Sequence, residues 1–242
     1  MAWPKTPGKH TQVEELFRFR IVQEYLKLVE KGVFAIRITC NAGHAMAEKL
    51  SHCRDNFLSL DAGCGDGHHF THVSSGKHIG IDSCAEFLQV ARKRYPSAPL
   101  MRGDVCNLPF RTGAFDRVVS MYLFEHLRNL PQVLLELRRV LKSNGELMVG
   151  VPAEGGLFYT LGRWFFMGRR MKKLFNIDYS HFMKIEHCNT YNEIKEALSG
   201  HFNVREIRYL PFLIPNMHLN AVVVLRCIKS AGRAAAQTRR NE

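Results

Sequence analysis

The sequence lacks several features that would place the protein in a membrane, in the secretory pathway or in a disulfide-bonded class. It has no apolar run of the roughly 18 residues that a membrane-spanning helix requires. Its first ten residues, MAWPKTPGKH, have no apolar stretch typical of a secretory signal. The seven cysteines are odd in number and form no C-x-x-C pair, which argues against a disulfide framework and a cysteine zinc site. We therefore expect a cytoplasmic protein with reduced cysteines.

Acidic residues are also scarce, with 22 against 34 basic residues and a formal net charge of +12. Much of the excess lies in residues 153–190 and 226–242, outside the expected catalytic core. A basic protein is compatible with nucleic-acid binding. Because much of the basic excess lies outside the expected catalytic core, the net charge alone does not indicate that function. The length of 242 residues, 46% of them hydrophobic and 23% charged, is typical of one globular domain with appendages.

What the sequence does contain is a regular alternation of strands and helices. After helical patterns over residues 11–31 and 36–50, it predicts strands at 56–61, 77–82, 98–104, 115–122 and 146–152 and helices at 83–95 and 130–141. Ser83 and Glu86 have the spacing of a capping box at the start of the first of these helices. A helix at 191–198 and two strands at 202–210 and 220–228 follow. This order predicts an α/β fold with a doubly wound, mostly parallel sheet covered on both faces.

The segment LDAGCGDG, residues 60–67, follows the first strand directly. Ligands of open parallel sheets bind outside the carboxyl ends of the strands. A glycine turn there allows backbone N–H groups to approach a ligand and directs the N-terminus of the following helix toward it. We therefore expect the turn to mark a ligand site.

Acids end three successive strands in this pattern. Asp61 precedes the glycine turn, and Asp82 ends the second strand after about 20 residues, the spacing at which a carboxylate receives ribose hydroxyls. Asp104 ends the third strand. Three carboxylates along one rim would repel a pyrophosphate but suit a ligand with a ribose, an exocyclic amine and net positive groups. S-adenosylmethionine has all of these.

Residues 57–152 resemble the class I S-adenosylmethionine-dependent methyltransferases, especially the small-molecule branch that includes quinone-biosynthesis enzymes. The segments LDAGCGDG, GIDSCAEFL, GDVCNLPF, AFDRVVSMYLFEHL and LRRVLKSNGELMVGVP are similar to successive motifs of that family, in order and spacing. The resemblance implies a Rossmann-like, seven-stranded sheet with an antiparallel last strand. It also implies methyl transfer from S-adenosylmethionine to an oxygen, nitrogen or carbon atom of a small-molecule acceptor.

The resemblance further implies a set of cofactor-binding residues. Their expected positions run from the glycine turn along the three acidic strand ends to the end of the fourth strand. Asp61, Gly63 and Gly65 would lie along the methionine portion, Asp82 would hold the ribose, and Asp104 would hold the adenine amine with the Val105 N–H. Met121 and Tyr122 would flank the sulfonium, and Cys64 and Ser83 complete the expected set.

The family has no single invariant base, so candidate catalytic residues come from their positions. His126, in FEHL, follows the fourth strand. His187 belongs to the segment after the fifth strand, as does His181, and in this family that segment lies above the cofactor. Structural roles compete with catalysis for all of these histidines. His68 and His72 have the i, i+4 spacing of metal ligands, but no third ligand is evident, so we expect a solvated helical face and no metal.

These observations divide the chain into five parts. They are an N-terminal helical cap (1–52), the S-adenosylmethionine-binding core (53–152), a lid or acceptor-side insertion (153–190), a closing helix and strand pair (191–229) and a basic flexible tail (230–242). Within the insertion, residues 156–175 combine an apolar helical face (Leu157, Leu161, Trp164, Phe165 and Met171) with bases (Arg163, Arg170 and Lys173). A lid over the acceptor, a membrane-surface helix, a nucleic-acid patch and a helix simply packed on the sheet all fit this pattern.

Two alternative functions stay open at this point. An RNA methyltransferase is one, although SMYLFEHL differs from the [DN]-P-P-[YFW] motif of base-methylating enzymes, and the cysteine arrangement for pyrimidine carbon methylation is missing. A methyltransferase-like protein that binds without catalysis is the other. The sequence does not indicate an oligomeric state.

Overall fold

The computed structural model describes residues 34–53, 56–164, 168–169, 172–173 and 186–229. By its internal contacts the chain divides into two units, residues 1–38 and 39–242. Of the first unit only the beginning of α2 (Phe34–Leu50) is described. The helix expected over residues 11–31 and the tail expected at 230–242 lie outside the described residues. All contacts discussed below belong to the second unit.

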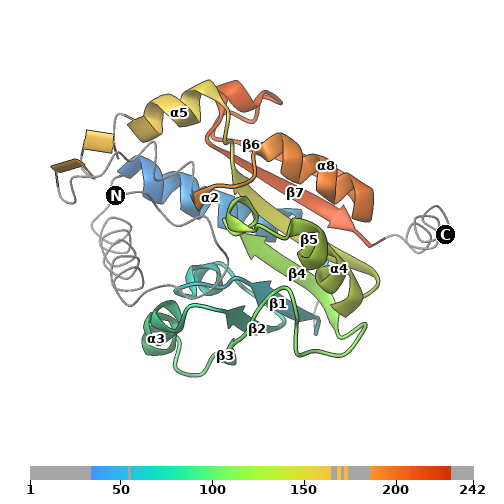
Figure 1. Ribbon diagram of the computed structural model, residues 1–242. Helices are drawn as coiled ribbons and strands as arrows, with labels where there is room; N and C mark the ends of the chain where they lie inside the picture. The colour runs from blue at the N-terminus through green and yellow to red at the C-terminus, as the bar shows by residue number, and fades with distance from the viewer. Residues whose placement is uncertain (1–33, 54–55, 165–167, 170–171, 174–185, 230–242) are drawn as a thin grey trace. The chain divides into compact units, whose positions relative to one another are not determined.

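Seven strands form one sheet in the order β3-β2-β1-β4-β5-β7-β6 (Figure 1). Neighbouring strands from β3 to β5 pair in parallel, whereas β7 runs antiparallel to β5 and to β6. The strand order therefore reverses between β1 and β4, and the predicted doubly wound sheet with an antiparallel last strand is confirmed. The strands are β1 (Leu58–Ala62), β2 (Lys77–Asp82), β3 (Leu100–Arg102), β4 (Phe115–Met121), β5 (Leu141–Pro152), β6 (Asn203–Leu210) and β7 (Val222–Ile228).

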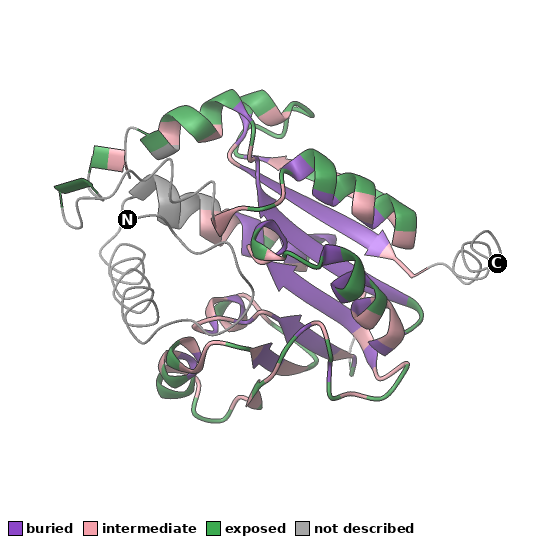
Figure 2. Ribbon diagram, in the orientation of Figure 1, coloured by how far each residue is buried: buried purple, intermediate pink, exposed green. Residues whose placement is uncertain are grey.

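The central strands are apolar on both faces because both faces of the sheet are covered. In β7, Val223, Leu225 and Cys227 belong to the larger core cluster, whereas Val222 and Val224 belong to a second cluster. This alternation follows from the two-residue period of a strand. Figure 2 shows the strands of the sheet largely buried and the outer faces of the helices exposed. The near-continuous apolar runs in the sequence are thus the expected signature of a sheet buried on both faces.

Helices on opposite faces complete the two clusters. The larger cluster includes residues of α4 (Leu130–Val140) and α8 (Tyr191–His201), and Thr190 and Glu193 form a capping box at the start of α8. On the other face, Ala47 and Leu50 of α2 belong to the second cluster. The remaining helical elements are η1 (His68–Thr71), α3 (Ala85–Arg94), η2 (Phe124–His126), α5 (Leu157–Arg163) and η4 (Met217–Leu219).

The structure corrects the local predictions made for the region from the glycine turn to the third strand. The third strand is shorter than 98–104 and ends at Arg102, before Gly103. The segment after the glycine turn forms only the 3-10 helix η1 instead of the expected α-helix. The capping box expected from Ser83 and Glu86 does not form, because α3 begins after Cys84 and the Asp82 carboxylate accepts the Cys84 N–H at 2.8 Å. Asp82 therefore supplies the acceptor at this helix start.

A buried guanidinium joins α2 to the sheet. Arg117 of β4 is 1% exposed, and its Nη2 atom lies 2.8 Å from Oε1 of Glu48 on α2. Its Nε donates to Ser59 Oγ at 3.1 Å, and its guanidinium lies over the Phe57 ring. Burial alone would raise the pKa of Glu48, but the neighbouring His69 and Arg117 outweigh it and lower this pKa to about 2. The pair is therefore ionised and fixes α2 against β4.

We predict that Arg117→Ala destabilises the protein by about 3–5 kcal/mol, because it leaves the Glu48 carboxylate partly buried without its guanidinium partner. Lys142→Ala is the matched control, since the Lys142 ammonium pairs with Asp116 at the surface and such pairs contribute roughly 0–1 kcal/mol. Urea unfolding of the three proteins measures both effects. Equal losses in the two variants would show that the Arg117 contacts do not anchor α2.

Candidate functional site

Acidic side chains lie at or just beyond the carboxyl ends of three neighbouring strands. Asp61 is the penultimate residue of β1, Asp82 is the last residue of β2, and Asp104 lies two residues beyond β3. Because β1, β2 and β3 pair in parallel, these ends share one edge of the sheet. The sequence correctly places the three acids along this edge, although Asp104 lies in the loop and does not end the strand.

The Asp61 carboxyl is buried, with 3% of the residue exposed. Within the described part of the chain its Oδ2 atom has no hydrogen-bond partner. Burial raises the pKa of Asp61 to about 6, although the nearby His69 opposes this rise. A buried carboxylate oxygen without a donor costs free energy. The site therefore suits a ligand that brings a donor or a positive charge.

The backbone amides of the glycine turn are used within the protein. Gly63 and Cys64 both donate their N–H groups to the carbonyl of Ile81, at 2.8 and 3.0 Å. Gly65 donates to Oδ2 of Asp82 at 2.9 Å. The expectation that these N–H groups face a ligand is therefore wrong, because β2 already binds them. With one hydrogen bond on each oxygen, an ionised Asp82 carboxylate still has the capacity for two hydroxyl donors.

The glycines of this turn contribute conformation and space. Gly63 has φ +77°, and a Cβ there would lie 2.7 Å from the Leu123 side chain. Gly65 has φ +53°, and a Cβ there would meet no atom within 4 Å. Both positions require the left-handed conformation that glycine adopts without strain. Gly65 additionally leaves the volume beside Asp82 open.

The other residues expected near the cofactor differ in exposure. Asp104 is exposed, and its Oδ1 accepts the Cys106 N–H at 2.8 Å. Ser83, also exposed, follows Asp82 directly. Val105 and Cys64 are buried, and burial raises the pKa of the Cys64 thiol. The cysteine is therefore a packing residue in its thiol form, whereas Asp104 can reach a ligand at the surface.

The end of β4 is marked by a strained residue. Tyr122 has φ +58° and donates its N–H to the Gly150 carbonyl at 2.7 Å. Positive φ is uncommon outside glycine and often occurs at functional sites. Met121, the last residue of β4, is buried against Gly150, where a Cβ would lie 2.1 Å from the methionine methyl. The strand expected to include Tyr122 therefore stops one residue earlier, where the backbone turns toward η2.

Four histidines pack together beside Tyr122. His68 and His72, expected on a solvated helical face, instead contact the ring of His44 on α2. His44 Nδ1 lies 3.1 Å from Nδ1 of His69, and the His69 imidazole reaches Glu48 at 3.0 Å. Desolvation by burial, followed by the other histidines, lowers the pKa of His44 well below its usual value. This imidazole cluster is therefore part of the packing between α2 and the η1 turn, and the expectation of a solvated face is wrong.

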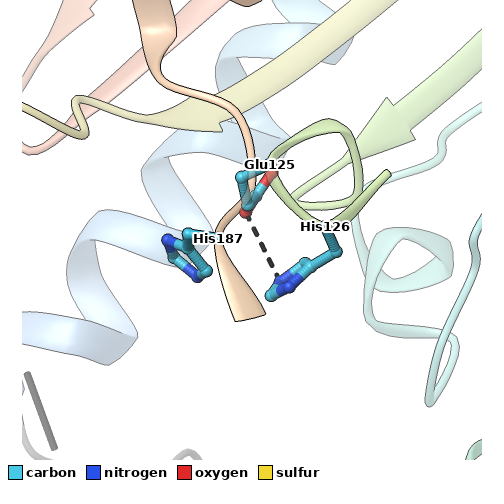
Figure 3. Close-up of side chains that lie close together, drawn as sticks. All are labelled: Glu125, His126 and His187. Carbon is cyan, nitrogen blue, oxygen red and sulfur yellow. Dashed lines mark ion pairs between the residues drawn. The ribbon is translucent and has the colours of Figure 1, made fainter. Parts of the chain in front are cut away.

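The structure brings together the two histidines selected as catalytic candidates. The rings of His126 and His187 lie 4.7 Å apart, nearly perpendicular (Figure 3). Glu125 lies beside them, with Oε1 3.9 Å from Nε2 of His126. Glu125 is 2% exposed, and its Oε2 has no hydrogen-bond partner among the described residues. Burial raises the pKa of Glu125 to about 8, and the charge of Glu154 adds to the rise.

Hydrogen bonds orient both rings. Nδ1 of His187 lies 2.8 Å from Oε2 of Glu154, and Nδ1 of His126 lies 3.0 Å from the Glu186 carbonyl. The Asn189 side-chain amide donates to the carbonyls of Phe124 and Leu127 at 2.8 and 2.6 Å. Asn189 therefore holds the segment before α8 against η2, which explains why two histidines distant in the sequence meet.

Sequence reasoning missed two acids of this cluster. Glu125 is adjacent to His126 in FEHL, and Glu154 follows Pro152 at the end of β5, beside β4 in the sheet. A search for acids just beyond strand ends, applied to the fourth and fifth strands as it was to the first three, would have found both. His181, also considered from the sequence, lies outside the described residues.

Two hollows occur at the opposite edge of the sheet. One, of about 290 Å³, is lined by Glu48, Phe57 and Arg117 among others, and another, of about 220 Å³, by residues near the start of β5. Neither includes a residue of the glycine turn or of the cluster around Glu125. The candidate site is therefore defined by its side chains at the carboxyl edge.

The sheet order, the antiparallel β7 and the glycine turn with its acidic neighbours define a class I S-adenosylmethionine-dependent methyltransferase fold. Residues 60–149 match the family model described as "Methyltransferase domain". This part of the chain is therefore similar to that family, as the sequence resemblance predicted.

Curated relatives with known names match the same region. A malonyl-[acyl-carrier protein] O-methyltransferase of Erwinia pyrifoliae is 35% identical over 112 residues, which cover 46% of this chain and 43% of the relative. A 2-phytyl-1,4-naphtoquinone methyltransferase of Synechocystis sp. is 34% identical over 116 residues, covering 43% of this chain and 49% of the relative. The matches thus span less than half the length of these relatives.

A solved structure confirms the fold over most of the chain. A SAM-dependent methyltransferase from Thermotoga maritima superposes with a TM-score of 0.60 at 22% identity, covering 87% of this chain and 97% of that one. The cofactor that this family implies is S-adenosylmethionine, a positively charged sulfonium carrying an ammonium group. The unpartnered buried oxygen of Asp61 and the open volume at Gly65 fit such a ligand.

We predict that Asp61 makes the protein less stable as the pH rises from about 4 to about 6. The unfolded carboxyl titrates near pH 3.9 and the folded one near 6. The folded state therefore binds more protons between these values, and its free energy of unfolding falls by roughly 2–3 kcal/mol across this window. Asp61→Asn removes this titration. Urea unfolding at pH 4.0, 5.0, 6.0 and 7.5 should show the variant gaining stability relative to the parent as pH rises. If the free energies of unfolding of the two proteins change with pH in parallel, the burial of the Asp61 charge is contradicted.

Proposed function

We propose that the protein transfers the methyl group of S-adenosylmethionine to a small-molecule acceptor. The observation that carries the proposal is the row of acids at the carboxyl ends of three neighbouring parallel strands, one of which holds a buried oxygen without a partner among the described residues. A basic chain that gathers acids at this edge favours a positively charged nucleoside ligand there. The family match over residues 60–149 supports the same reaction.

Different residues of this edge would bind different parts of the cofactor. We assign the positively charged methionine portion to Asp61, because its buried carboxyl gains a partner and its charge is compensated. Asp82 would accept the ribose hydroxyls with the lone pairs that the Gly65 and Cys84 amides leave available. The exposed Asp104, with the Val105 N–H, would hold the adenine amine. The walls of the proposed cofactor site would be formed by Cys64, Ser83 and Gly63. The cofactor's sulfur would be flanked by Met121 and Tyr122.

Catalysis then depends mainly on alignment. S-adenosylmethionine supplies a methyl group that is already activated by the positive charge on sulfur. Holding an acceptor in line with it can contribute roughly 7–11 kcal/mol at best. Tyr122, fixed by its backbone bond to Gly150, sets the wall from which the acceptor approaches. We place the acceptor on the side of His126 and His187, whose Nε2 atoms carry lone pairs because each Nδ1 donates a hydrogen bond.

We predict that Asp82→Ala weakens S-adenosylmethionine binding by at least about tenfold, because two hydroxyls of the ribose lose a charged acceptor. Asp116→Ala is the matched control. The Asp116 carboxylate also accepts a backbone N–H, that of Leu58 at 3.0 Å, but it lies at the opposite edge of the sheet. Isothermal titration calorimetry with S-adenosylmethionine and S-adenosylhomocysteine measures the affinities. If a folded Asp82→Ala protein binds S-adenosylmethionine with unchanged affinity, the assignment of the ribose to Asp82 is wrong.

An apolar surface favours a lipophilic acceptor of the kind that quinone methyltransferases use. α5 exposes Leu157, Phe158 and Leu161, with Trp164 directly after it, and the β6–β7 connection exposes Phe212, Leu213, Ile214 and Leu219. The Phe158 and Phe212 rings contact each other at 5.7 Å. We call these eight residues the α5 surface. Phe165, Arg170 and Met171, expected on the same helix, lie outside the described residues.

Bases accompany the α5 surface. Arg169 lies over the Trp164 ring, and Lys172 and Lys173 are exposed. Among the described helices, none has the length and apolarity needed to cross a bilayer. Apolar side chains flanked by bases are typical of peripheral contact with an anionic membrane. We propose that a cytoplasmic enzyme reaches a membrane-dissolved acceptor through this surface.

We predict that the protein floats with vesicles of phosphatidylserine and phosphatidylcholine, and less with phosphatidylcholine alone. Replacing Leu161 and Trp164 together by Ser should reduce the bound fraction several-fold, because it removes apolar area available for insertion. Leu135→Ser, which changes an exposed leucine of α4, is the control and should not alter binding. Parent protein that stays in solution at low salt with both vesicle types would contradict the membrane role but not methyl transfer.

A further inference from the structure

The cluster of Glu125, His126 and His187 has the composition and spacing of a metal site. We propose that these three side chains bind one divalent transition-metal ion, best matched by Zn²⁺. One ligand atom from each residue lies within 4.8 Å of the others, and the residues converge from η2 and from the segment before α8 (Figure 3). The sequence provided no motif for such a site, because His187 is far from the other two residues in the chain.

The tautomers of both histidines are those of metal ligands. A carbonyl oxygen can only accept, so Nδ1 of His126 donates to Glu186, and the Glu154 carboxylate accepts from Nδ1 of His187 in the same way. In the neutral ring with this tautomer, each Nε2 atom offers a lone pair. Histidines that bind metals usually donate their second ring N–H to a carboxylate or a backbone carbonyl, which fixes tautomer and orientation. Here both kinds of partner are present.

Glu125 is the carboxylate ligand of the proposed site. The residue is 2% exposed, and its Oε2 has no hydrogen-bond partner in the described residues. A buried carboxylate in this state needs a proton or a cation. The distance from Oε1 to Nε2 of His126 is 3.9 Å. Ligand atoms on a tetrahedral ion with bonds of about 2.0–2.2 Å lie roughly 3.3–3.6 Å apart, so small side-chain rotations close the site.

The ligand types select the ion. Two imidazoles and one carboxylate suit Zn²⁺ and related first-row ions, whereas Mg²⁺ and Ca²⁺ prefer sites made of oxygen atoms. Three protein ligands leave a fourth position open, the arrangement of catalytic rather than structural zinc sites. His126, which is 40% exposed, gives that position access from outside.

A role in catalysis rests on the proposed methyl transfer. An acceptor hydroxyl bound at the open position would lose its proton to solvent more readily, because the ion lowers the pKa of a bound O–H group. The resulting oxygen forms a bond to the methyl carbon as the carbon–sulfur bond breaks, and the electron pair of that bond stays on sulfur as a neutral thioether. A histidine acting alone as general base would not need a buried carboxylate beside it. The position of Glu125 therefore favours activation of the acceptor by a metal ion.

The test is metal binding by the full-length protein after treatment with a chelator. We expect isothermal titration with Zn²⁺ to give one tight site, and Co²⁺ to give the visible absorption of a tetrahedral complex. Mg²⁺ should bind at least 100-fold more weakly. His126→Gln and His187→Gln should each weaken Zn²⁺ binding by at least about 100-fold. Glu154→Gln should weaken it by roughly 10–100-fold, because it loosens the orientation of the His187 ring.

Two control variants separate this site from other ligands in the chain. His72→Gln changes the imidazole cluster beside α2, and Cys188→Ser removes an exposed thiol next to His187. Neither should alter Zn²⁺ affinity, and equal losses in either control would overturn the ligand set. Parent protein that binds no Zn²⁺ while binding S-adenosylmethionine would refute the metal site alone. Failure of S-adenosylmethionine binding with intact Zn²⁺ binding would refute the proposed function alone.

Discussion

β1 and β4 pair in parallel, with Leu60 opposite Val118. After β1 the chain adds β2 and β3 on one side of this pair, and after β4 it adds β5, β6 and β7 on the other side. This single pairing sets the point at which the strand order reverses, where loops from both halves of the sheet diverge and leave room for a ligand. Asp61 is the penultimate residue of β1, and Tyr122 directly follows β4. Every residue that we assign to cofactor or acceptor lies at the same edge because parallel strands end there together.

Charge at this edge is arranged at a cost to stability. Asp61 and Glu125 are buried carboxyls whose pKa values burial raises, and each has an oxygen without a hydrogen-bond partner among the described residues. Two other acids of the described chain, the partly buried Glu48 and the buried Glu146, instead form ion pairs with arginines. Glu48 meets Arg117, and Glu146 accepts from Nε and Nη2 of Arg226 at 2.9 and 2.6 Å. Glu48 and Glu146 each lie beside an arginine, whereas no ion pair with a lysine or arginine is found for Asp61 or Glu125 among the described residues, and this contrast favours ligands at the latter two.

The fold was predictable because its signals are local and periodic. Alternating strands and amphipathic helices, such as α4 with its apolar residues three and four apart, identify the sheet and its coverage. The site was only partly predictable. Asp61, Asp82 and Asp104 follow strand ends and could be read directly, whereas the meeting of His126 with His187 depends on Asn189, whose three-dimensional contacts with η2 leave no pattern in the sequence. The amides of the glycine turn were misjudged because their acceptors, Ile81 and Asp82, belong to a different strand.

The imidazole cluster links the anchoring of α2 to the candidate site. Arg117 contacts Glu48, Glu48 contacts His69, and His69 contacts His44, whose ring meets that of Tyr122. One turn away from His44 on the same helix, the Cys40 carbonyl accepts the Tyr122 hydroxyl at 3.5 Å. A Cβ on Gly43 would lie 2.3 Å from that hydroxyl, so α2 approaches Tyr122 closely along this side. The strained backbone of Tyr122 is thus supported from the sheet through Gly150 and from α2 through its side chain. The same helix is also held by the ion pair between Glu48 and Arg117, so contacts of both Cys40 and Glu48 position α2 beside Tyr122.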